Sequence, residues 1–310
     1  MKIAVLMTGE DQGQDSYGSK ACAALTEAGH EVVPILASEN MALALAQERP
    51  DMCFPAFSRT EEQGLAAQEL LSFLDIPAVG SEPEVCRLAI DRRAIPRVLS
   101  TYTELTDESL AAACPAGFSF SVECFKAFGV QKVLDLAHKQ IPGGFPLCVK
   151  PRSAACSVAA VRVSDDAQLK SACMNLVDQG QDVLVQQWVE GVTLYVAVLG
   201  EGWDAYALPP AREVDDCVYK APVEKSILSP SESLAEAIRS EIERAAVEVC
   251  RAFNVRDMAL VKLIWDGAQA RIIEVDPSPC ICPGSAFAAS YEAAGITFPT
   301  LMNALVGGME

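Results

Sequence analysis

Two carboxylates close the apolar segment Arg271-Ile-Ile-Glu-Val-Asp276, in which Glu274 and Asp276 are separated by one residue. Successive side chains of a β-strand alternate between its faces, so these two carboxylates are expected on one face. Carboxylates at the end of a buried strand need a cationic partner, and their oxygens suit a Mg²⁺ ion that bridges phosphate groups. The spacing therefore favours a nucleotide site, whereas a strand that ends in a solvated acidic turn is the alternative for this segment alone.

A lysine ends a second apolar segment, Phe145-Pro-Leu-Cys-Val-Lys-Pro151. Taken by itself, Lys150 is typical of an edge strand that carries a charge. The segment that follows, Arg152-Ser-Ala-Ala-Cys-Ser157, consists mostly of small residues, which let backbone N–H groups approach a phosphate. Ser153 and Ser157 are thus candidate phosphate contacts beside Lys150.

Length and composition indicate an ordered globular protein of two or three domains. The chain has 310 residues, 51% of them hydrophobic, and a formal net charge of −18. This charge argues against nucleic acid as a partner, because phosphate backbones require surfaces rich in Lys and Arg. The longest apolar runs fall short of the roughly 18 residues of a membrane span, and Met1 to Met7 is typical of a first strand. We expect a cytoplasmic protein that does not enter membranes.

The 12 cysteines are dispersed through apolar segments, which is typical of small buried side chains in a reducing compartment. The close pair is Cys280-Ile-Cys282. A single C-x-C motif is a weak signal for a metal or redox site. That function is kept as an alternative.

Strands and helices alternate regularly through the first domain, which we place at residues 1–84. Expected strands include Glu31–Leu36 and Met52–Pro55, and a helix is expected near Tyr17–Ala28. A short strand is expected at Ile76–Val79. Such alternation predicts a doubly wound parallel sheet.

Two further domains are predicted, at residues 85–182 and 183–310. The second is expected to begin with one helix from Val85 to Ser100, and the third with a strand from Val183 to Val189. The Pro-rich segment between Pro209 and Pro230 is a candidate lid. The predicted fold class is therefore α/β together with α+β.

The order of these parts resembles the ATP-grasp superfamily and, within it, the D-alanine–D-alanine ligase family. The resemblance covers nearly the whole chain, and it is carried by Phe145 to Pro151, Val185-Gln-Gln-Trp-Val-Glu-Gly191, Glu274-Val-Asp-Pro-Ser-Pro279 and Glu292-Ala-Ala-Gly-Ile-Thr-Phe-Pro299. It implies an ATP-grasp fold in which ATP lies between two antiparallel sheets. It also implies that a carboxylate is phosphorylated to an acyl phosphate, which an amine then attacks.

The resemblance implies a set of nucleotide contacts. Lys150 matches a lysine on the α- and β-phosphates, Arg92 replaces a nucleotide-contacting lysine, and Gln186, Trp188 and Val189 occupy the adenine-side segment. ATP is the implied cofactor.

The resemblance also implies groups for the chemistry. Lys220 corresponds to a lid lysine that reaches the γ-phosphate, and Ser285 matches a substrate-binding serine. Glu274 matches a Mg²⁺ ligand, and Asp276 stands where the family usually has asparagine. A small amino-acid substrate and a homodimer paired through the N-terminal domains are implied as partners.

Departures from the family pattern fall on the chemistry. Leu260 replaces an arginine that steadies the oxyanion, and Lys262 replaces a metal-binding aspartate. A charged ammonium cannot donate an electron pair to Mg²⁺, but Lys262 could take the place of one metal ion. A diverged ATP-dependent ligase is therefore weighed against a degenerate homologue that binds a nucleotide without turnover, as a regulatory or scaffold protein.

Overall fold

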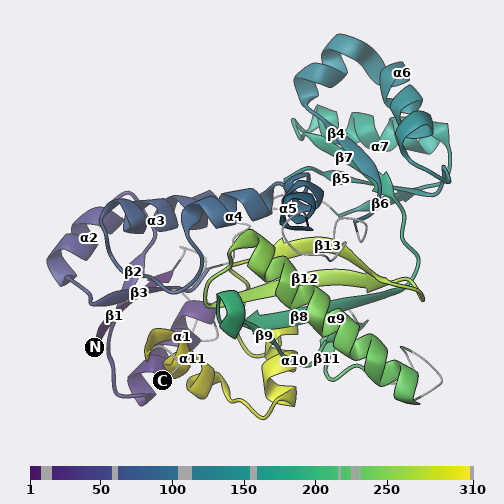
Figure 1. Ribbon diagram of the computed structural model, residues 1–310. Helices are drawn as coiled ribbons and strands as arrows, with labels where there is room; N and C mark the ends of the chain where they lie inside the picture. The colour runs from purple at the N-terminus through teal and green to yellow at the C-terminus, as the bar shows by residue number, and fades with distance from the viewer. Residues whose placement is uncertain are drawn as a thin grey trace. The chain divides into compact units, whose positions relative to one another are not determined.

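Figure 1 shows the protein as a computed structural model, which describes residues 1–7, 16–57, 62–103, 114–153, 159–215, 218–224, 228 and 232–307. The chain forms two compact units. Unit 1 comprises Met1–Arg87, Thr193–Lys262 and Val275–Glu310, and unit 2 comprises Leu88–Val192 and Leu263–Glu274.

The N-terminal part of unit 1 contains a parallel three-stranded sheet in the order β2-β1-β3. Its strands are β1 (Lys2–Met7), β2 (Glu31–Leu36) and β3 (Met52–Pro55). Residues of β1 alternate between two hydrophobic clusters, because Ile3 and Val5 belong to one and Ala4 and Leu6 to the other. A strand buried on both faces explains the continuous apolar run and confirms the predicted parallel sheet.

Helices α1 (Tyr17–Glu27), α2 (Met41–Glu48) and α3 (Glu62–Phe73) connect and flank these strands. The start of α1 is fixed by Ser16, whose hydroxyl accepts a hydrogen bond from the Ser19 N–H at 3.2 Å. This cap satisfies one of the N–H groups that a helix leaves without a partner at its start.

The predicted strand at Ile76–Val79 is wrong in extent, because the structure contains a single bridge there, between Cys53 and Ala78. Pro77 has no N–H to donate to a ladder, and Gly80 has a φ of +101°, which turns the chain away.

The remainder of unit 1 is built around a four-stranded sheet in the order β13-β12-β8-β9 and a separate hairpin. The chain boundaries between the units fall within β12 and β13. The strands are β8 (Val192–Leu199), β9 (Tyr206–Ala207), β12 (Met258–Trp265) and β13 (Ala270–Asp276), and the hairpin is β10 (Arg212–Asp215) with β11 (Val218–Lys220). A short 3₁₀ helix, η2 (Gly202–Asp204), and helices α9 (Glu232–Phe253), α10 (Ala286–Ala293) and α11 (Phe298–Gly307) complete it.

Unit 2 contains an antiparallel four-stranded sheet in the order β4-β7-β5-β6. The strands are β4 (Gly117–Phe120), β5 (Leu147–Pro151), β6 (Val161–Val163) and β7 (Val183–Gln187). Helices α6 (Val122–Gln140) and α7 (Asp166–Asp178) pack on one face of this sheet (Figure 1), and the cluster between them includes Val149 and Val185. The combination of parallel and antiparallel sheets confirms the predicted mixed fold class.

The single helix predicted from Val85 to Ser100 is also wrong, because the chain forms α4 (Pro83–Ile90) and α5 (Ala94–Thr103) with a break between them. Asp91 bridges to Ser153, and the Arg92 N–H donates to the Arg152 carbonyl at 3.2 Å. These tertiary hydrogen bonds replace those that would continue the helix.

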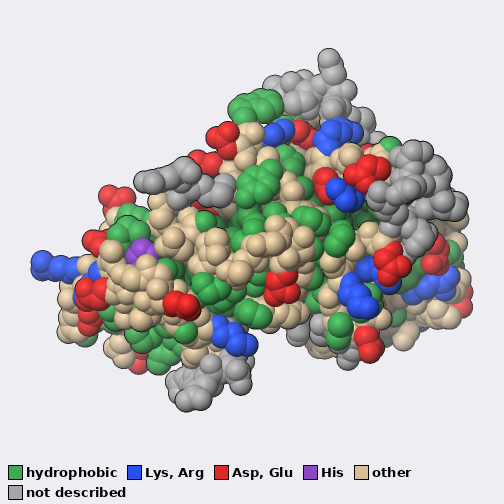
Figure 2. Space-filling view, turned by 90° about the horizontal axis from the view of Figure 1, so that it is seen from below, with side chains coloured by type: hydrophobic (Ala, Val, Ile, Leu, Met, Phe, Trp, Pro, Cys, Tyr) green, Lys and Arg blue, Asp and Glu red, His purple; other side chains and the backbone are tan. Residues whose placement is uncertain are grey.

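None of the helices among the described residues is long and apolar enough to cross a membrane. On the face shown in Figure 2, the acidic and basic side chains drawn in colour are interspersed with polar and apolar ones.

Candidate functional site

Lys150 lies near the end of β5, a central strand of the unit 2 sheet, and only 6% of it is exposed. Its neighbour Val149 packs in the cluster with α6 and α7, so alternation directs Lys150 to the opposite face. A buried ammonium is costly unless it has polar or anionic partners. The strand thus places one cation on the sheet face that these helices leave uncovered.

Gln186 projects from the same face of the sheet. It pairs with Cys148 in the register of β7 and β5, while Lys150 pairs with Leu184. Residues directly opposite each other in an antiparallel pair share a face. Both Leu184 and Gln186 line a cavity of about 560 Å³ in unit 2.

This cavity, which we call the arginine cavity, is also lined by three arginines. They are Arg92, Arg93 and Arg97. Its volume falls in the range of about 300–1,000 Å³ that is usual for small-molecule sites. The arginine cavity therefore brings together Arg92 and Gln186, two residues predicted to contact the nucleotide, and adds two cations that the sequence had not singled out.

Arg92 fastens the chain that follows Lys150. One guanidinium nitrogen, Nη1, donates to the carbonyls of Pro151 at 3.0 Å and Ser153 at 2.8 Å. Its Nη2 lies 3.4 Å from Oε1 of Glu274, and the two side chains are 12% and 18% exposed. The Arg92 Nε is buried and makes no hydrogen bond within the described part of the chain. Arg92 thus holds Pro151 and Ser153 in place and compensates the charge of Glu274.

A second ion-pair network, not predicted from the sequence, holds Arg152 at the end of β5. Arg152 donates to both carboxylate oxygens of Asp91, at 2.9 and 2.6 Å, and its Nη1 lies 3.5 Å from Oδ2 of Asp182. The hydrogen bonds from Arg152 lower the pKa of Asp91 despite partial burial. Asp182 in turn accepts from the Val122 N–H at 3.1 Å, so the network joins β5 to the start of α6.

The other residues predicted on the nucleotide side have separate surroundings. The Trp188 indole N–H donates to Glu190 at 2.9 Å, and the Arg162 guanidinium lies 5.8 Å from its ring centroid. Val189 follows it and is partly buried. Neither Trp188 nor Val189 lines the arginine cavity as the described residues define it. Ser157 lies outside the described residues.

In unit 1, Lys220 ends the β10–β11 hairpin and lines a cavity of about 430 Å³. Arg212 lies in the same lining, together with Glu224 and with Glu292 of α10. Two cations and two carboxylates around one space suit a ligand that carries charges of both signs.

Lys262 lies on β12, and its Nζ is 5.4 Å from the centroid of the Tyr195 ring. Tyr195 in turn makes an edge-to-face contact with Tyr219 of the hairpin, with 5.3 Å between ring centroids. A cation over an aromatic face is stabilised by the ring quadrupole. The structure therefore gives Lys262 an aromatic neighbour beside the strand that carries Lys220.

Ser285 caps α10, because its hydroxyl accepts from the Ala288 N–H at 3.0 Å. Its own N–H donates to the Cys282 carbonyl at 3.1 Å. The predicted substrate-binding serine thus also fixes the start of a helix, and its position depends on the turn that precedes it.

The predicted Mg²⁺ ligands do not assemble the donor set of a metal site. In the described ranges, no group of three or more His, Cys, Asp or Glu side chains could hold a metal ion. Glu274 faces the Arg92 guanidinium, and in unit 1 Oδ1 of Asp276 accepts from the Ser278 N–H at 3.1 Å. Two carboxylates alone do not complete a Mg²⁺ site, and their assignment as metal ligands stays a prediction.

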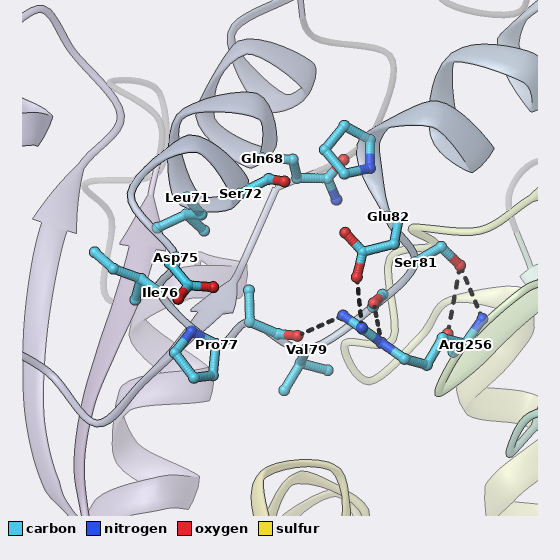
Figure 3. A pocket seen from close by; sticks show the side chains of 13 residues that line it. Gln68, Leu71, Ser72, Asp75, Ile76, Pro77, Val79, Ser81, Glu82 and Arg256 are labelled. Carbon is cyan, nitrogen blue, oxygen red and sulfur yellow. Dashed lines mark hydrogen bonds and ion pairs between the residues drawn. The ribbon is translucent and has the colours of Figure 1, made fainter.

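A further cavity of unit 1, about 250 Å³ in volume, is organised by Arg256 (Figure 3). Its guanidinium donates to the carbonyls of Ala78 at 3.0 Å and Gly80 at 2.9 Å, and to the Glu82 carboxylate at 2.6 Å. The Gly80 N–H donates to Asp257 at 2.7 Å. These polar groups are already hydrogen-bonded to one another. Arg256 and Asp257 therefore act as an anchor for the segment Ala78–Glu82, and we call this arrangement the loop anchor.

Comparison with known proteins agrees with this architecture. The family model described as D-ala D-ala ligase C-terminus matches residues 130–307. Curated relatives include D-alanine–D-alanine ligases from Desulforudis audaxviator (strain MP104C), 27% identical over 98% of this chain and 97% of the relative, and from Aquifex aeolicus (strain VF5), 23% identical over 99% and 100%.

Solved structures of similar fold include the D-alanine–D-alanine ligase from Bacillus anthracis complexed with ATP. It superposes with a TM-score of 0.75, at 19% identity, over 99% of this chain and 96% of that one. The VanG D-Ala:D-Ser ligase from Enterococcus faecalis gives a TM-score of 0.73, at 16% identity, over 99% and 98%. The structure thus has the fold that the sequence predicted, and this chain belongs to the D-alanine–D-alanine ligase family of ATP-grasp proteins.

Proposed function

We propose that this protein is an ATP-dependent carboxylate–amine ligase that joins two small amino acids through an acyl phosphate. The observation that carries the proposal is the arginine cavity, where Arg92, Arg93 and Arg97 gather beside Gln186 on the sheet face to which Lys150 projects. Anionic phosphates are bound strongly by guanidinium and ammonium groups through charge-assisted hydrogen bonds.

In the proposed reaction, a carboxylate oxygen of the first amino acid attacks the γ-phosphorus of ATP, and the bond to the β-phosphate oxygen breaks, which releases ADP. The amine of the second amino acid then attacks the acyl carbon, phosphate leaves, and the amine loses a proton. Lys150 and Arg92 bind phosphate oxygens, Lys220 binds the phosphoryl group that is transferred, and Ser285 binds substrate. Fixed cations of this kind stabilise the charge that develops during phosphoryl transfer.

Support for this function comes from the family to which the chain belongs and from relatives named as D-alanine–D-alanine ligases over nearly their full length. A neighbour of the same fold was solved with ATP. We propose ATP as the nucleotide, the cytoplasm as the location and a homodimer as the assembly, with the domain boundaries near residues 84 and 182.

The proposal is tested by supplying ATP, Mg²⁺ and candidate small acids such as D-alanine, D-serine or D-lactate, and by measuring ADP and phosphate. Release that depends on the acid and is lost in Lys150→Met supports the function. The control Lys132→Met, at an exposed position of α6, should keep it. Absence of turnover with every acid contradicts the ligase function.

A second candidate, a nucleotide-binding protein without turnover, is favoured by the ion pair between Arg92 and Glu274. An internal cation at this carboxylate leaves no charge for a metal to neutralise. This candidate predicts that ATP raises the melting temperature equally with and without Mg²⁺ and that no ADP forms.

A further inference from the structure

Two thiols lie side by side in the segment that joins β13 to α10. The sulfur atoms of Cys280 and Cys282 are 2.9 Å apart. Ile281 between them is fully buried in a hydrophobic cluster of unit 1, and both cysteines are partly buried against that cluster. Because Ile281 is buried, the side chains of Cys280 and Cys282 lie together on the same side of this segment.

Three other cysteines among the described residues have different surroundings. Burial raises the pKa of the Cys53 and Cys173 thiols to about 12, which keeps them protonated and unreactive. Cys124 is exposed on α6. Cys280 and Cys282 combine partial exposure with an adjacent second thiol, and these features are typical of a cysteine with a resolving partner.

Tyr291 supplies an independent observation beside the pair. Its side chain is fully buried, and its hydroxyl makes no hydrogen bond in the part of the chain that the structure describes. Burial first, and then the charges of Glu292, Cys282 and Cys280, raise the pKa of Tyr291. The Tyr291 phenol interacts electrostatically with both cysteines and keeps its proton. A protonated phenol can donate a hydrogen bond to a thiolate.

We propose that Cys280 and Cys282 form a dithiol oxidation site that reacts with hydroperoxides and closes to an intramolecular disulfide. One thiolate attacks the peroxide, the O–O bond breaks, and the sulfur becomes a sulfenic acid while the distal oxygen leaves as hydroxide or alkoxide. The second thiol then attacks this sulfur, the S–O bond breaks, and water leaves. The two sulfurs lose two electrons, which reduce the peroxide, and they need only a small displacement to reach a disulfide length of about 2.05 Å.

The disulfide would affect Ser285, the residue that we propose binds substrate. The Cys282 carbonyl accepts from the Ser285 N–H, so a bond at Cys282 constrains the turn that places the Ser285 hydroxyl at the start of α10. Oxidation is therefore expected to lower ligase turnover, a consequence that rests on the proposed function, whereas disulfide formation does not.

The site is tested on the full chain, reduced, freed of reductant and exposed to hydrogen peroxide. Remaining thiols are alkylated, the protein is digested with trypsin, and the peptide that follows Arg271, which contains Cys280 and Cys282 and no other cysteine, is weighed. We expect this peptide to lose two hydrogen atoms and take up no alkyl group, and dithiothreitol to reverse the change. Cys282→Ser should abolish the mass loss and leave a sulfenic acid at Cys280 that dimedone traps.

The control Cys124→Ser should form the same disulfide at the same rate. A peptide that is alkylated at both cysteines after peroxide, or oxidation of Cys124 before the pair, would overturn the proposal. Turnover is measured on the same samples. If the disulfide forms and neither redox state is active, the ligase function fails while the dithiol site stands. If both states are equally active, the effect on Ser285 is refuted.

Discussion

The guanidinium of Arg92 lies 3.4 Å from the carboxylate of Glu274, and the same group holds the carbonyls of Pro151 and Ser153. One arginine thus joins the segment after Lys150 to a carboxylate that the family resemblance assigns to a metal ion. Where a divalent ion would neutralise Glu274, this chain supplies a covalently attached cation. The relationship links the fold of unit 2 to the charge of the proposed nucleotide site.

Replacing Arg92 tests directly whether its guanidinium takes the place of a metal ion beside Glu274. In Arg92→Ala, Glu274 loses its internal cation and becomes available to Mg²⁺. We expect the ATP-induced rise in melting temperature to depend more strongly on Mg²⁺ in the variant than in the wild type, as measured by thermal denaturation with and without EDTA. Equal dependence in both proteins would refute the role given to Arg92. Arg162→Ala, beside Trp188, is the matched control.

Removal of the Lys150 ammonium should weaken nucleotide binding. A hydrogen bond to a charged group contributes about 1.5–3 kcal/mol, so Lys150→Met is expected to reduce ATP affinity about 10- to 100-fold by calorimetry. Lys150→Arg should retain part of this affinity because the charge remains. An unchanged affinity in Lys150→Met would place the phosphates elsewhere.

The Asp91–Arg152 pair predicts a dependence of stability on pH. Because the pKa of Asp91 is lowered in the folded state, its contribution is present above the unfolded value of about 3.9 and is lost as the pH falls below it. Urea unfolding at pH 7 and pH 3 should show a smaller acid loss in Asp91→Asn than in the wild type. The difference is expected to be about 1 kcal/mol or less, since both side chains are more than one-quarter exposed. Identical acid losses would contradict the pair's contribution.

Arg256 is expected to stabilise unit 1 through its loop anchor. Arg256→Ala removes three donated hydrogen bonds to Ala78, Gly80 and Glu82 and should lower the free energy of unfolding by about 2 kcal/mol. The control Arg87→Ala breaks only an exposed pair with Glu69 and should cost about 0–1 kcal/mol. Equal losses in the two variants would show that the anchor adds nothing beyond a surface ion pair.

The sequence predicted the elements of this fold well where periodicity is strong. The β1 segment lies as expected, because its apolar run matches its burial. The helix expected from Val85 to Ser100 was wrong, since its break depends on hydrogen bonds to Arg152 and Ser153, about sixty residues away in the chain. Local propensity carries no information on such distant partners.

Prediction of the site was limited in the same way. The register of β5 and β7 brings Gln186 to the face of Lys150, and alternation alone indicates this once both strands are known. The contributions of Arg93 and Arg97 to the cavity were missed. Both lie in the helix that the sequence predicted from Val85 to Ser100, where two further cations are typical of a solvated surface. Arg93 directly follows Asp91-Arg92 in the break before α5, and this position is the one signal that could have identified it.

The central claim is that a nucleotide binds on the sheet face of unit 2 that carries Lys150 and borders the arginine cavity. A crystal structure of the protein with a non-hydrolysable ATP analogue tests it most directly. The account predicts phosphate oxygens within hydrogen-bonding distance of Lys150 and Arg92 and the base beside Gln186. Phosphates bound at another surface, or an arginine cavity that remains empty at saturating analogue, would contradict it.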